Sequence, residues 1–297
     1  MHSHLVISAF LRSLCATAVL AAGTAVCLGA DSLPAKVVVA LKPDKNPDAM
    51  LAERGALSQS LSKILGRPVE VIVPLSATVI IEGLANGSID LGWLGATDMV
   101  HAREADAAEL LLVGDIDGKR EYSSLWLCLE EKPYASIEDL RGKPVAFAGR
   151  TSTSGHLIPR LDLKKRRLIK NDPEEFFGEG NVWFGTGYMS GVERVLAGEA
   201  EAAAVSDYVF EKDKHMTPDQ KKRLRILSHQ GPVPTHVLAV SKRLDPAARE
   251  SLREGLLEFS ATDPALCLTV FTSPLVNADA DEHLRPVVEA LAILPKQ

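Results

Sequence analysis

The sequence predicts an α/β fold with two lobes, each a mainly parallel sheet flanked by helices, and a cleft between the lobes. Three observations support this prediction. Short apolar runs alternate with amphipathic runs of helical length along most of the chain, which is typical of βαβ units. The 297 residues suffice for one large domain or two medium ones, and 46% of them are apolar. Two short motifs also occur once in each half, in the same order.

These repeated motifs indicate that the two halves are related. Leu65-Gly-Arg-Pro-Val69 recurs as Arg141-Gly-Lys-Pro-Val145, each time where a helix is expected to run into a strand. The segment 84–90 is matched by the shorter segment 196–201. Gly is common at helix ends, so one recurrence could arise by chance, but two in the same order weigh more. We therefore expect a first lobe of residues 31–120 plus 232–297 and a second lobe of residues 121–231.

Apolar and β-branched runs predict the strands, and the amphipathic segments between them predict the helices. In the first half the expected strands are 37–41, 69–73, 89–91 and 110–113, and the expected helices end at Gly66 and span 79–85 and 97–104. In the second half the expected strands are 122–129, 145–148, 182–184, 202–205, 224–227 and 237–240. Short helices are expected after Ser136 and over 190–196. Asp245-Pro246 opens a mostly helical C-terminal region.

The first thirty residues resemble a secretory signal peptide. Arg12 precedes an apolar run over 14–28, and Leu28-Gly-Ala30 precedes Asp31. We expect cleavage after Ala30 and a periplasmic protein. A lipid anchor on Cys27 is the minor alternative, since Val26 is a poor residue to precede a lipidated cysteine. No later segment has an uninterrupted apolar run of membrane length.

Charge and cysteine content narrow the possible partners. The 33 basic and 39 acidic residues give a net charge of -6, which argues against binding to nucleic acid or to an anionic membrane. Cys128 and Cys267 lie in apolar runs and are expected to be buried, and their pairing is left open. No CxxC or Cys/His spacing is present, so we predict neither a metal site nor a cofactor.

The stretch Thr151-Ser-Thr-Ser-Gly155 is the strongest candidate for chemistry. It lies between an apolar run, 144–148, and an amphipathic run, 156–167, which predicts a strand, a turn and a helix N-terminus. The first N–H groups of a helix lack internal partners and carry partial positive charge. Four hydroxyls beside them could donate to an oxyanion. The alternative is an ordinary N-cap, and the sequence leaves both open.

With these residues placed, the chain resembles the phosphonate-type substrate-binding proteins of ABC transporters, a branch of the type II periplasmic binding fold. The resemblance runs from about Lys36 to about Ser241. It rests mainly on Ser136-Ile-Glu-Asp-Leu-Arg-Gly-Lys-Pro-Val-Ala-Phe followed by Ser152-Thr-Ser-Gly155. Tyr122-Ser-Ser124 and the segment 77–95, with its Trp-x-Gly, also match the family's pattern.

The resemblance implies a binding site for a small oxyanion of the phosphonate, phosphite or phosphate class. Ser152, Thr153, Ser154 and the helix amides around Gly155 would hold the oxyanion, and Tyr122 would add a hydroxyl near the hinge. The chain would cross between the lobes near 117–122 and 230–235. The implied partner is a membrane permease, and we expect a monomer.

Several positions depart from the family's pattern. A His commonly found before the helix near 190 is replaced by Tyr188, which we expect to line the cleft. An acidic residue that pairs with the amine of aminophosphonates is replaced by Met189. Glu201 would be a second acidic partner, or it reflects a repeated preference at strand starts. His156 is either a cationic partner for a dianion or a solvent-facing residue of the first helical turn.

The sequence therefore favours an extracytoplasmic receptor of an ABC importer over an enzyme. One alternative keeps the binding fold but makes the protein a ligand sensor for a membrane kinase. Another is a hydrolase with Ser152 or Ser154 as nucleophile and His156 or His236 as base, although no G-x-S-x-G motif is present. Which oxyanion is bound cannot be read from the sequence.

Overall fold

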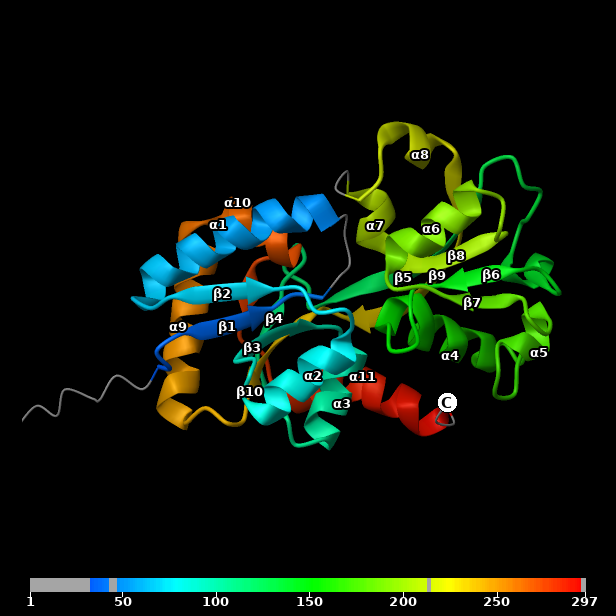
Figure 1. The fold of residues 1–297 in the computed structure, drawn as a ribbon. Helices are drawn as coiled ribbons and strands as arrows, with labels where there is room; N and C mark the ends of the chain where they lie inside the picture. Colours follow the sequence, from blue (N-terminus) through cyan, green and yellow to red (C-terminus); the bar gives the residue numbers. More distant parts are fainter. Residues whose placement is uncertain (1–32, 43–46, 213–214, 295–297) are drawn as a thin grey trace, which may run out of the picture. The chain divides into compact units, whose positions relative to one another are not determined.

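The computed structural model describes residues 33–42, 47–212 and 215–294, and the fold is drawn in Figure 1. The expected signal peptide and Cys27 lie outside the described residues. Among the residues described, none of the helices combines the length and apolar character that crossing a membrane requires.

The first lobe contains a six-stranded sheet in the order β11-β4-β10-β3-β1-β2. β1 pairs in parallel with β2 and β3, while β10 pairs antiparallel with both β3 and β4. β10 follows the second lobe in sequence, so the chain returns to the middle of the first sheet. The strands are β1 (Val37–Ala40), β2 (Val69–Ile72), β3 (Leu91–Leu94), β4 (Ala108–Gly114), β10 (Val237–Ser241) and β11 (Leu275–Val276).

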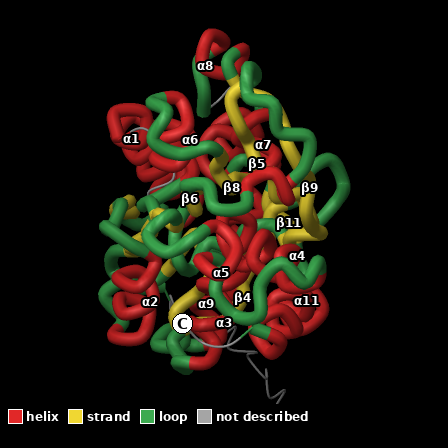
Figure 2. The backbone as a smooth tube through the Cα atoms, turned by 90° about the vertical axis from the view of Figure 1, so that its right-hand side faces the viewer, coloured by secondary structure: helices red, strands yellow, loops and turns green. Residues whose placement is uncertain are grey.

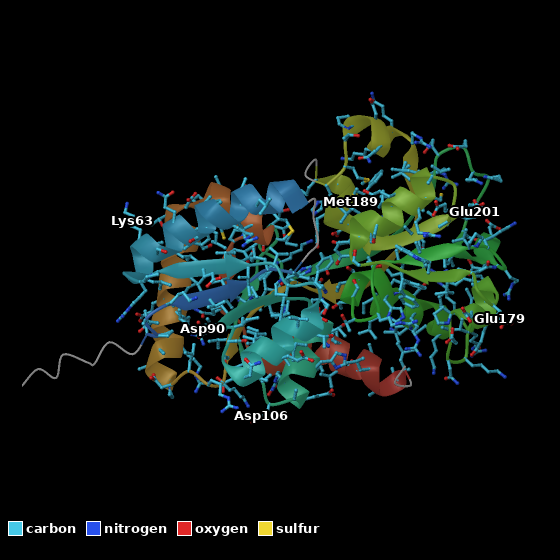
Figure 3. All side chains as sticks on the ribbon, viewed as in Figure 1. Lys63, Asp90, Asp106, Glu179, Met189 and Glu201 are labelled. Carbon is cyan, nitrogen blue, oxygen red and sulfur yellow. The ribbon has the colours of Figure 1, made fainter. Side chains whose placement is uncertain are left out.

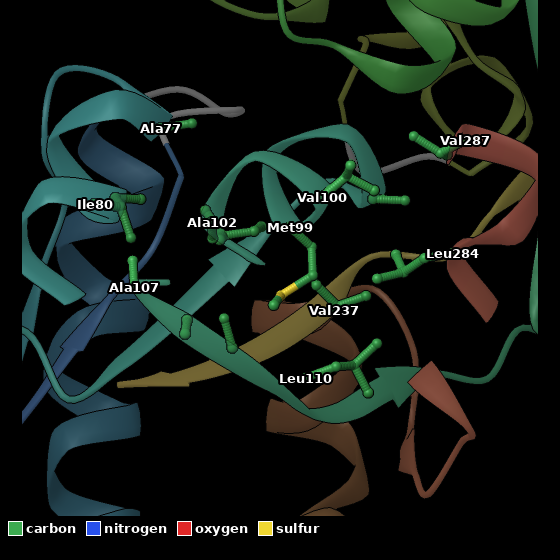
Figure 4. Packing of buried hydrophobic residues seen from close by; sticks show 14 of the residues in the cluster. Ala77, Ile80, Met99, Val100, Ala102, Ala107, Leu110, Val237, Leu284 and Val287 are labelled. Carbon is green, nitrogen blue, oxygen red and sulfur yellow. The ribbon is translucent and has the colours of Figure 1, made fainter. Parts of the chain in front are cut away.

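Helices cover both faces of this sheet. One face packs against α1 (Pro47–Leu65), α9 (Pro246–Thr262) and α10 (Pro264–Phe271), and the other against α2 (Ala77–Asn86), α3 (Ala96–Glu104) and α11 (Ala280–Ile293). Side chains alternate between faces along a strand, so Val37 and Val39 join the first core while Val38 and Ala40 join the second. Figure 4 shows the second core, in which Met99 of α3 lies near Leu284 of α11.

The second lobe contains a five-stranded sheet in the order β7-β6-β8-β5-β9. β6 pairs in parallel with β7 and β8, and β5 pairs antiparallel with β8 and β9. Its strands are β5 (Glu121–Leu129), β6 (Val145–Phe147), β7 (Val182–Phe184), β8 (Ala202–Ser206) and β9 (Leu224–Pro234). β9 extends to Pro234, beyond the boundary at residue 231 that the sequence suggests.

The helical segments of the second lobe also lie on both faces of its sheet. They are η1 (Ile137–Leu140), the π-helical turn η2 (Thr153–Leu157), α4 (Ile158–Lys165), α5 (Glu174–Phe177), α6 (Tyr188–Leu196), α7 (Asp207–Glu211) and α8 (Pro218–Lys222). An aromatic core that includes Trp126, Phe147 and Phe177 fills one face. Tyr188, Val192 and Tyr208 pack on the other face.

The chain passes between the lobes after β4 and again between β9 and β10. Thr235 ties these two crossings together, because its N–H donates to the Arg120 carbonyl at 3.0 Å and its hydroxyl donates to the Gly114 carbonyl at 2.7 Å. Away from the crossings, α4 of the second lobe lies beside α11 of the first (Figure 2), and Leu161 of α4 packs into the core formed by Leu284 and Val287.

The two cysteines of the described region answer the question of pairing that the sequence left open. Cys128 lies on β5 in the aromatic core of the second lobe, and Cys267 lies on α10 in a core of the first lobe. Both are free thiols, and burial raises the pKa of each. They are packing residues of different lobes.

Candidate functional site

A cavity of about 230 Å³ lies where segments of the two lobes meet. The first lobe contributes the end of β1, the turn before α2 and the crossing before β10, and the second lobe contributes the loops after β6 and β7. The lining residues are Lys42, Leu75, Ser76, Ala77, Ala148, Gly149, Arg150, Thr151, Ser152, Gly185, Thr186, Gly187, Tyr188 and His236. Pockets for drug-sized ligands measure about 300–1,000 Å³, so this cavity suits a smaller ligand.

Three of the described helical segments begin at the cavity. α2 has Ser76 as its N-cap, η2 has Ser152, and α6 has Gly187, and each of these three cap residues lines the cavity. η2 continues in helical conformation into α4. None of the three segments has an acidic residue in its first turn. The cavity therefore meets partly positive helix ends that no carboxylate of their own neutralises.

Lys42 brings an ammonium group to the same cavity, as one half of an ion pair with a buried carboxylate. It follows β1 directly, and its Nζ lies 2.7 Å from Oδ2 of Asp98, a fully buried residue in the first turn of α3. The sequence pattern places Lys42 at the start of a loop and does not single it out. A signal was present, because ligands of parallel sheets bind beyond the carboxyl ends of the strands.

Only part of the hydroxyl stretch faces the cavity. Thr151 and Ser152 line it, and Ser152 Oγ also accepts a hydrogen bond from the Gly155 N–H at 3.1 Å as the N-cap of η2. Gly155 lets η2 approach the end of β6, since a Cβ there would lie 2.4 Å from the Cβ of Ala148. Thr153 turns toward the first lobe, where its Oγ1 accepts a hydrogen bond from the Thr97 N–H. The expected convergence of four hydroxyls is not what the structure shows.

Ser154 joins the two candidate tyrosines. Its Oγ lies 2.8 Å from the Tyr188 hydroxyl and accepts a hydrogen bond from the Tyr122 hydroxyl at 3.2 Å. Tyr188 lines the cavity, whereas Tyr122 lies behind it. Burial raises the pKa of Tyr122 well above its usual value, so its hydroxyl is a neutral donor. Ser154 and Tyr122 are thus placed to orient Tyr188.

His236 lines the cavity from the crossing between β9 and β10. Its ring is stacked between Trp93, at 5.6 Å between centroids, and Tyr122, at 6.0 Å. Burial lowers the pKa of His236 to about 3, so the ring is neutral near pH 7. Its ring nitrogens make no hydrogen bond to any residue of the described ranges, which leaves them available to a ligand, while its backbone carbonyl accepts from the Gly114 N–H at 2.9 Å. The sequence analysis had considered it only as the base of a hydrolase.

Both interpretations of His156 offered from the sequence are wrong. It is 3% exposed and packs edge-on against Phe147 and Phe184, at 5.1 and 5.0 Å between ring centroids. Its Nδ1 lies 2.7 Å from the carbonyl oxygen of Arg150. Burial lowers the pKa of His156 to about 4. The residue is therefore neither solvent-facing nor a cation, and it is absent from the cavity lining.

Glu201 and Met189, both labelled on the second lobe in Figure 3, are not among the residues that line the cavity. Glu201 precedes β8 and contacts Lys132 Nζ at 2.8 Å and the Tyr134 hydroxyl at 2.9 Å. Asp90 occupies the corresponding place before β3, where its Oδ2 accepts a hydrogen bond from the Val38 N–H at 2.7 Å. At the starts of both β8 and β3, the acidic side chain is therefore bonded to residues of its own lobe.

The contacts of the two serines bear on the hydrolase alternative. Among the described residues, neither Ser152 nor Ser154 is hydrogen bonded to a histidine ring, and their partners are an amide and two tyrosines. The described residues also contain no group of three or more His, Cys, Asp or Glu side chains that could hold a metal ion.

Comparisons with known proteins identify the family and the fold. A family model described as "ABC transporter, phosphonate, periplasmic substrate-binding protein" matches residues 39–283. The phosphate-import protein PhnD of Mycolicibacterium smegmatis is 25% identical over 231 residues, which cover 75% of this chain and 72% of that protein.

Two solved structures have the same fold. PhnD1 of Prochlorococcus marinus in complex with methylphosphonate matches with a TM-score of 0.76 and 20% identity, covering 86% of this chain and 97% of that one. A Xanthomonas citri protein bound to ATP matches with a TM-score of 0.69 and 21% identity, covering 87% and 98%. At these identities the structures show the fold alone, which is the two-lobed type II periplasmic binding fold.

Proposed function

Because the chain belongs to the family of periplasmic substrate-binding proteins of phosphonate ABC transporters, we propose that its interlobe cavity captures a small phosphorus oxyanion. The protein is the extracytoplasmic binding component of such a transporter. Its partners are a small ligand and a membrane permease. We further propose that it acts as a monomer in this role.

The single observation that carries the proposed ligand class is the convergence of three helix N-termini on one cavity. The N-caps of α2, η2 and α6 all line it, and Lys42 adds an ammonium group whose charge is paired with the buried carboxylate of Asp98. The net charge of -6 gives the whole molecule no general attraction for anions. An oxyanion would therefore be selected by this local arrangement of amides, hydroxyls and one ammonium group.

The structure changes the set of residues that we propose as ligand contacts. Ser152 and Tyr188 stay as direct contacts, and Thr151, Lys42 and His236 are added, since all five line the cavity. Tyr122, Ser154 and Gly155 are proposed to shape the site from behind. We leave His156 and Glu201 out of the proposed set, because each has its polar contacts inside the second lobe.

One wall of the cavity suits a carbon substituent on the ligand. Leu75 is 91% exposed and lines the cavity together with Ala77 and Ala148. The described lining residues include no Asp or Glu that could pair with a ligand amine. We therefore propose that a simple alkylphosphonate such as methylphosphonate binds more tightly than 2-aminoethylphosphonate.

Calorimetric titration of the purified protein with methylphosphonate, phosphite, phosphate, 2-aminoethylphosphonate and sulfate tests this function. We expect binding of at least one phosphorus oxyanion, with methylphosphonate preferred over its amino derivative. Lys42→Met should weaken that binding, whereas Lys132→Met, whose partner Glu201 lies outside the cavity lining, is the matched control and should not. If none of the phosphorus compounds binds, the proposed ligand class is wrong.

Export through the N-terminal segment is a separate proposal. It rests on the apolar run over 14–28 and on the periplasmic family to which the chain belongs. The intact mass of protein recovered from the periplasm of its host should correspond to a chain that begins near Asp31. A mass that retains residues 1–30 without a lipid would contradict cleavage at that position.

A further inference from the structure

Two buried threonines connect the lobes close to the cavity. Thr153 Oγ1 of η2 accepts a hydrogen bond from the Thr97 N–H of α3 at 3.0 Å, and the two hydroxyl oxygens lie 2.9 Å apart. Thr97 is 2% exposed and Thr153 is 3% exposed. Neither residue lines the cavity. The hydroxyl of Thr153 is therefore occupied by a partner from the other lobe.

The partner of Thr153 is a helix N-terminus that lacks a side-chain cap of its own. The N-cap of α3 is Gly95, which makes no side-chain hydrogen bond, whereas α2 and η2 are capped by Ser76 and Ser152. Thr153 provides the acceptor that an N-cap side chain would normally provide.

We propose that Thr97 and Thr153 form a latch that stabilises the closed arrangement of the lobes, with Thr153 capping α3 across the interface. Thr97 is then a positioning residue, which contributes to ligand capture without touching the ligand. The effect of the latch on ligand binding rests on the proposed function, whereas its effect on lobe closure does not. We call these two parts of the inference the binding arm and the closure arm.

The position of Thr153 couples the latch to the site. Ser152, the preceding residue, lines the cavity, and Ser154, the following one, holds Tyr188. When the lobes separate, the Thr97 N–H and both hydroxyls must exchange their partners for water. The apparent affinity for a ligand falls in proportion to the fraction of molecules in the binding-competent closed state. Loss of the latch should therefore weaken capture even though no ligand contact is removed.

The closure arm is tested without ligand. Spin labels on cysteines introduced by Thr78→Cys in α2 and Glu193→Cys in α6, both exposed positions, report the distance between the lobes. Cys128 and Cys267 are buried. Thr153→Val should raise the ratio of long to short distances between the labels about tenfold. Thr97→Val, which keeps the amide donor, should raise this ratio about threefold.

Two variants serve as controls. Thr153→Ser keeps the hydroxyl and should match the parent protein, as should Thr262→Val on α9. A Thr153→Val distribution identical to the parent would overturn the latch.

The binding arm is a double-mutant cycle with methylphosphonate as the probe. Thr97→Val should weaken binding about threefold in the parent and should have no further effect in the Thr153→Val background, because both changes break one interaction. If Thr97→Val binds as tightly as the parent while Thr153→Val does not, Thr153 contacts the ligand and the latch is wrong. If the parent binds no phosphorus oxyanion, the proposed function fails, and the distance measurement still decides whether the latch exists.

Discussion

Helices that begin at the cavity differ from helices that begin on the outside of the first lobe. α9, α10 and α11 start with Asp245, Asp263 and Asp279, and each carboxylate accepts a hydrogen bond from an N–H of the first turn. α2, η2 and α6 start with Ser76, Ser152 and Gly187, with no acidic residue in the first turn. In both groups of helices the first N–H groups have no partner within the helix itself, and the N-terminus carries the same partial positive charge.

The difference shows where a chain with a net negative charge can still bind an anion. A carboxylate at an N-terminus satisfies the helix within its own lobe and removes its attraction for an external anion. A hydroxyl or a glycine at the N-cap allows the helix to begin without adding a negative charge, so the partial positive charge of the N-terminus stays available. The account therefore predicts that the charge at these N-caps, more than the presence of a cap, decides whether ligand binds.

The largest expected effect comes from placing a carboxylate at a cavity N-terminus. Ser76→Asp keeps an oxygen acceptor for α2 but adds a full negative charge beside the bound oxyanion. Like charges about 4 Å apart repel by about 4 kcal/mol at an effective dielectric constant of about 20, so methylphosphonate affinity should fall on the order of a thousandfold. Calorimetry measures the affinity.

Thr217→Asp is the matched control for this substitution. Thr217 caps α8 through its hydroxyl and lies outside the cavity lining. The same chemical change there should leave affinity unchanged. Thermal melting should show both variants folded, because aspartate is as good an N-cap as serine or threonine. Equal losses of affinity in the two variants would refute the role of the cavity N-termini.

Two of the buried histidines, His156 and His236, extend the comparison to stability in acid. Their pKa values in the folded state, about 4 for His156 and about 3 for His236, lie below the value of about 6.5 for an unfolded histidine. At a pH between the folded pKa of each histidine and about 6.5, the unfolded chain binds more protons than the folded chain. Acid therefore destabilises the fold as the pH falls below about 6.5. Each histidine contributes up to about 1.4 kcal/mol of unfolding free energy per pH unit.

Replacing each histidine by phenylalanine separates stability from binding. Either variant should lose part of the pH dependence of unfolding, measured by urea denaturation between pH 4 and 7. Only His236→Phe should also weaken methylphosphonate binding, by about tenfold, because His236 lines the cavity and His156 does not. Weaker binding in His156→Phe, with His236→Phe unchanged, would reverse our assignment of the two residues.

The smallest expected effect comes from removing an outer cap. Asp245→Ala deletes the carboxylate that accepts from the Ala248 N–H at 2.8 Å. Stability should fall by about 1 kcal/mol, which lowers the melting temperature by about 2–4 °C in a chain of this size. Ligand affinity should not change. Asp245→Ser should recover most of the stability, and a loss of binding in Asp245→Ala would contradict the division between inner and outer caps.

The strands were the most predictable part of the fold, because apolar β-branched runs such as Val69–Ile72 carry a clear local signal. The two-residue strand β11 was missed because so short a segment has no periodicity. β3 begins at Leu91, where the predicted strand ends, since Gly92 within the strand and Gly95 directly after it obscure the pattern.

The site was less predictable for a geometric reason. Successive residues of a helical turn point in different directions, so neighbouring hydroxyls such as those of Thr153 and Ser154 cannot point to one place. Lys42 and His236 come from segments far apart in the sequence, and only the sheet topology brings them to one cavity. His156 was misjudged because the sequence does not reveal that Phe147 and Phe184 enclose it.

The central claim is that the oxyanion binds at the inner helix N-termini, and amide chemical shifts measured during a methylphosphonate titration test it most directly. The account predicts the largest changes at the first residues of α2, η2 and α6, namely Ala77, Thr153 and Tyr188, and little change at the first residues of α9, α10 and α11. Saturable binding that leaves the amides of Ala77, Thr153 and Tyr188 unperturbed would contradict it.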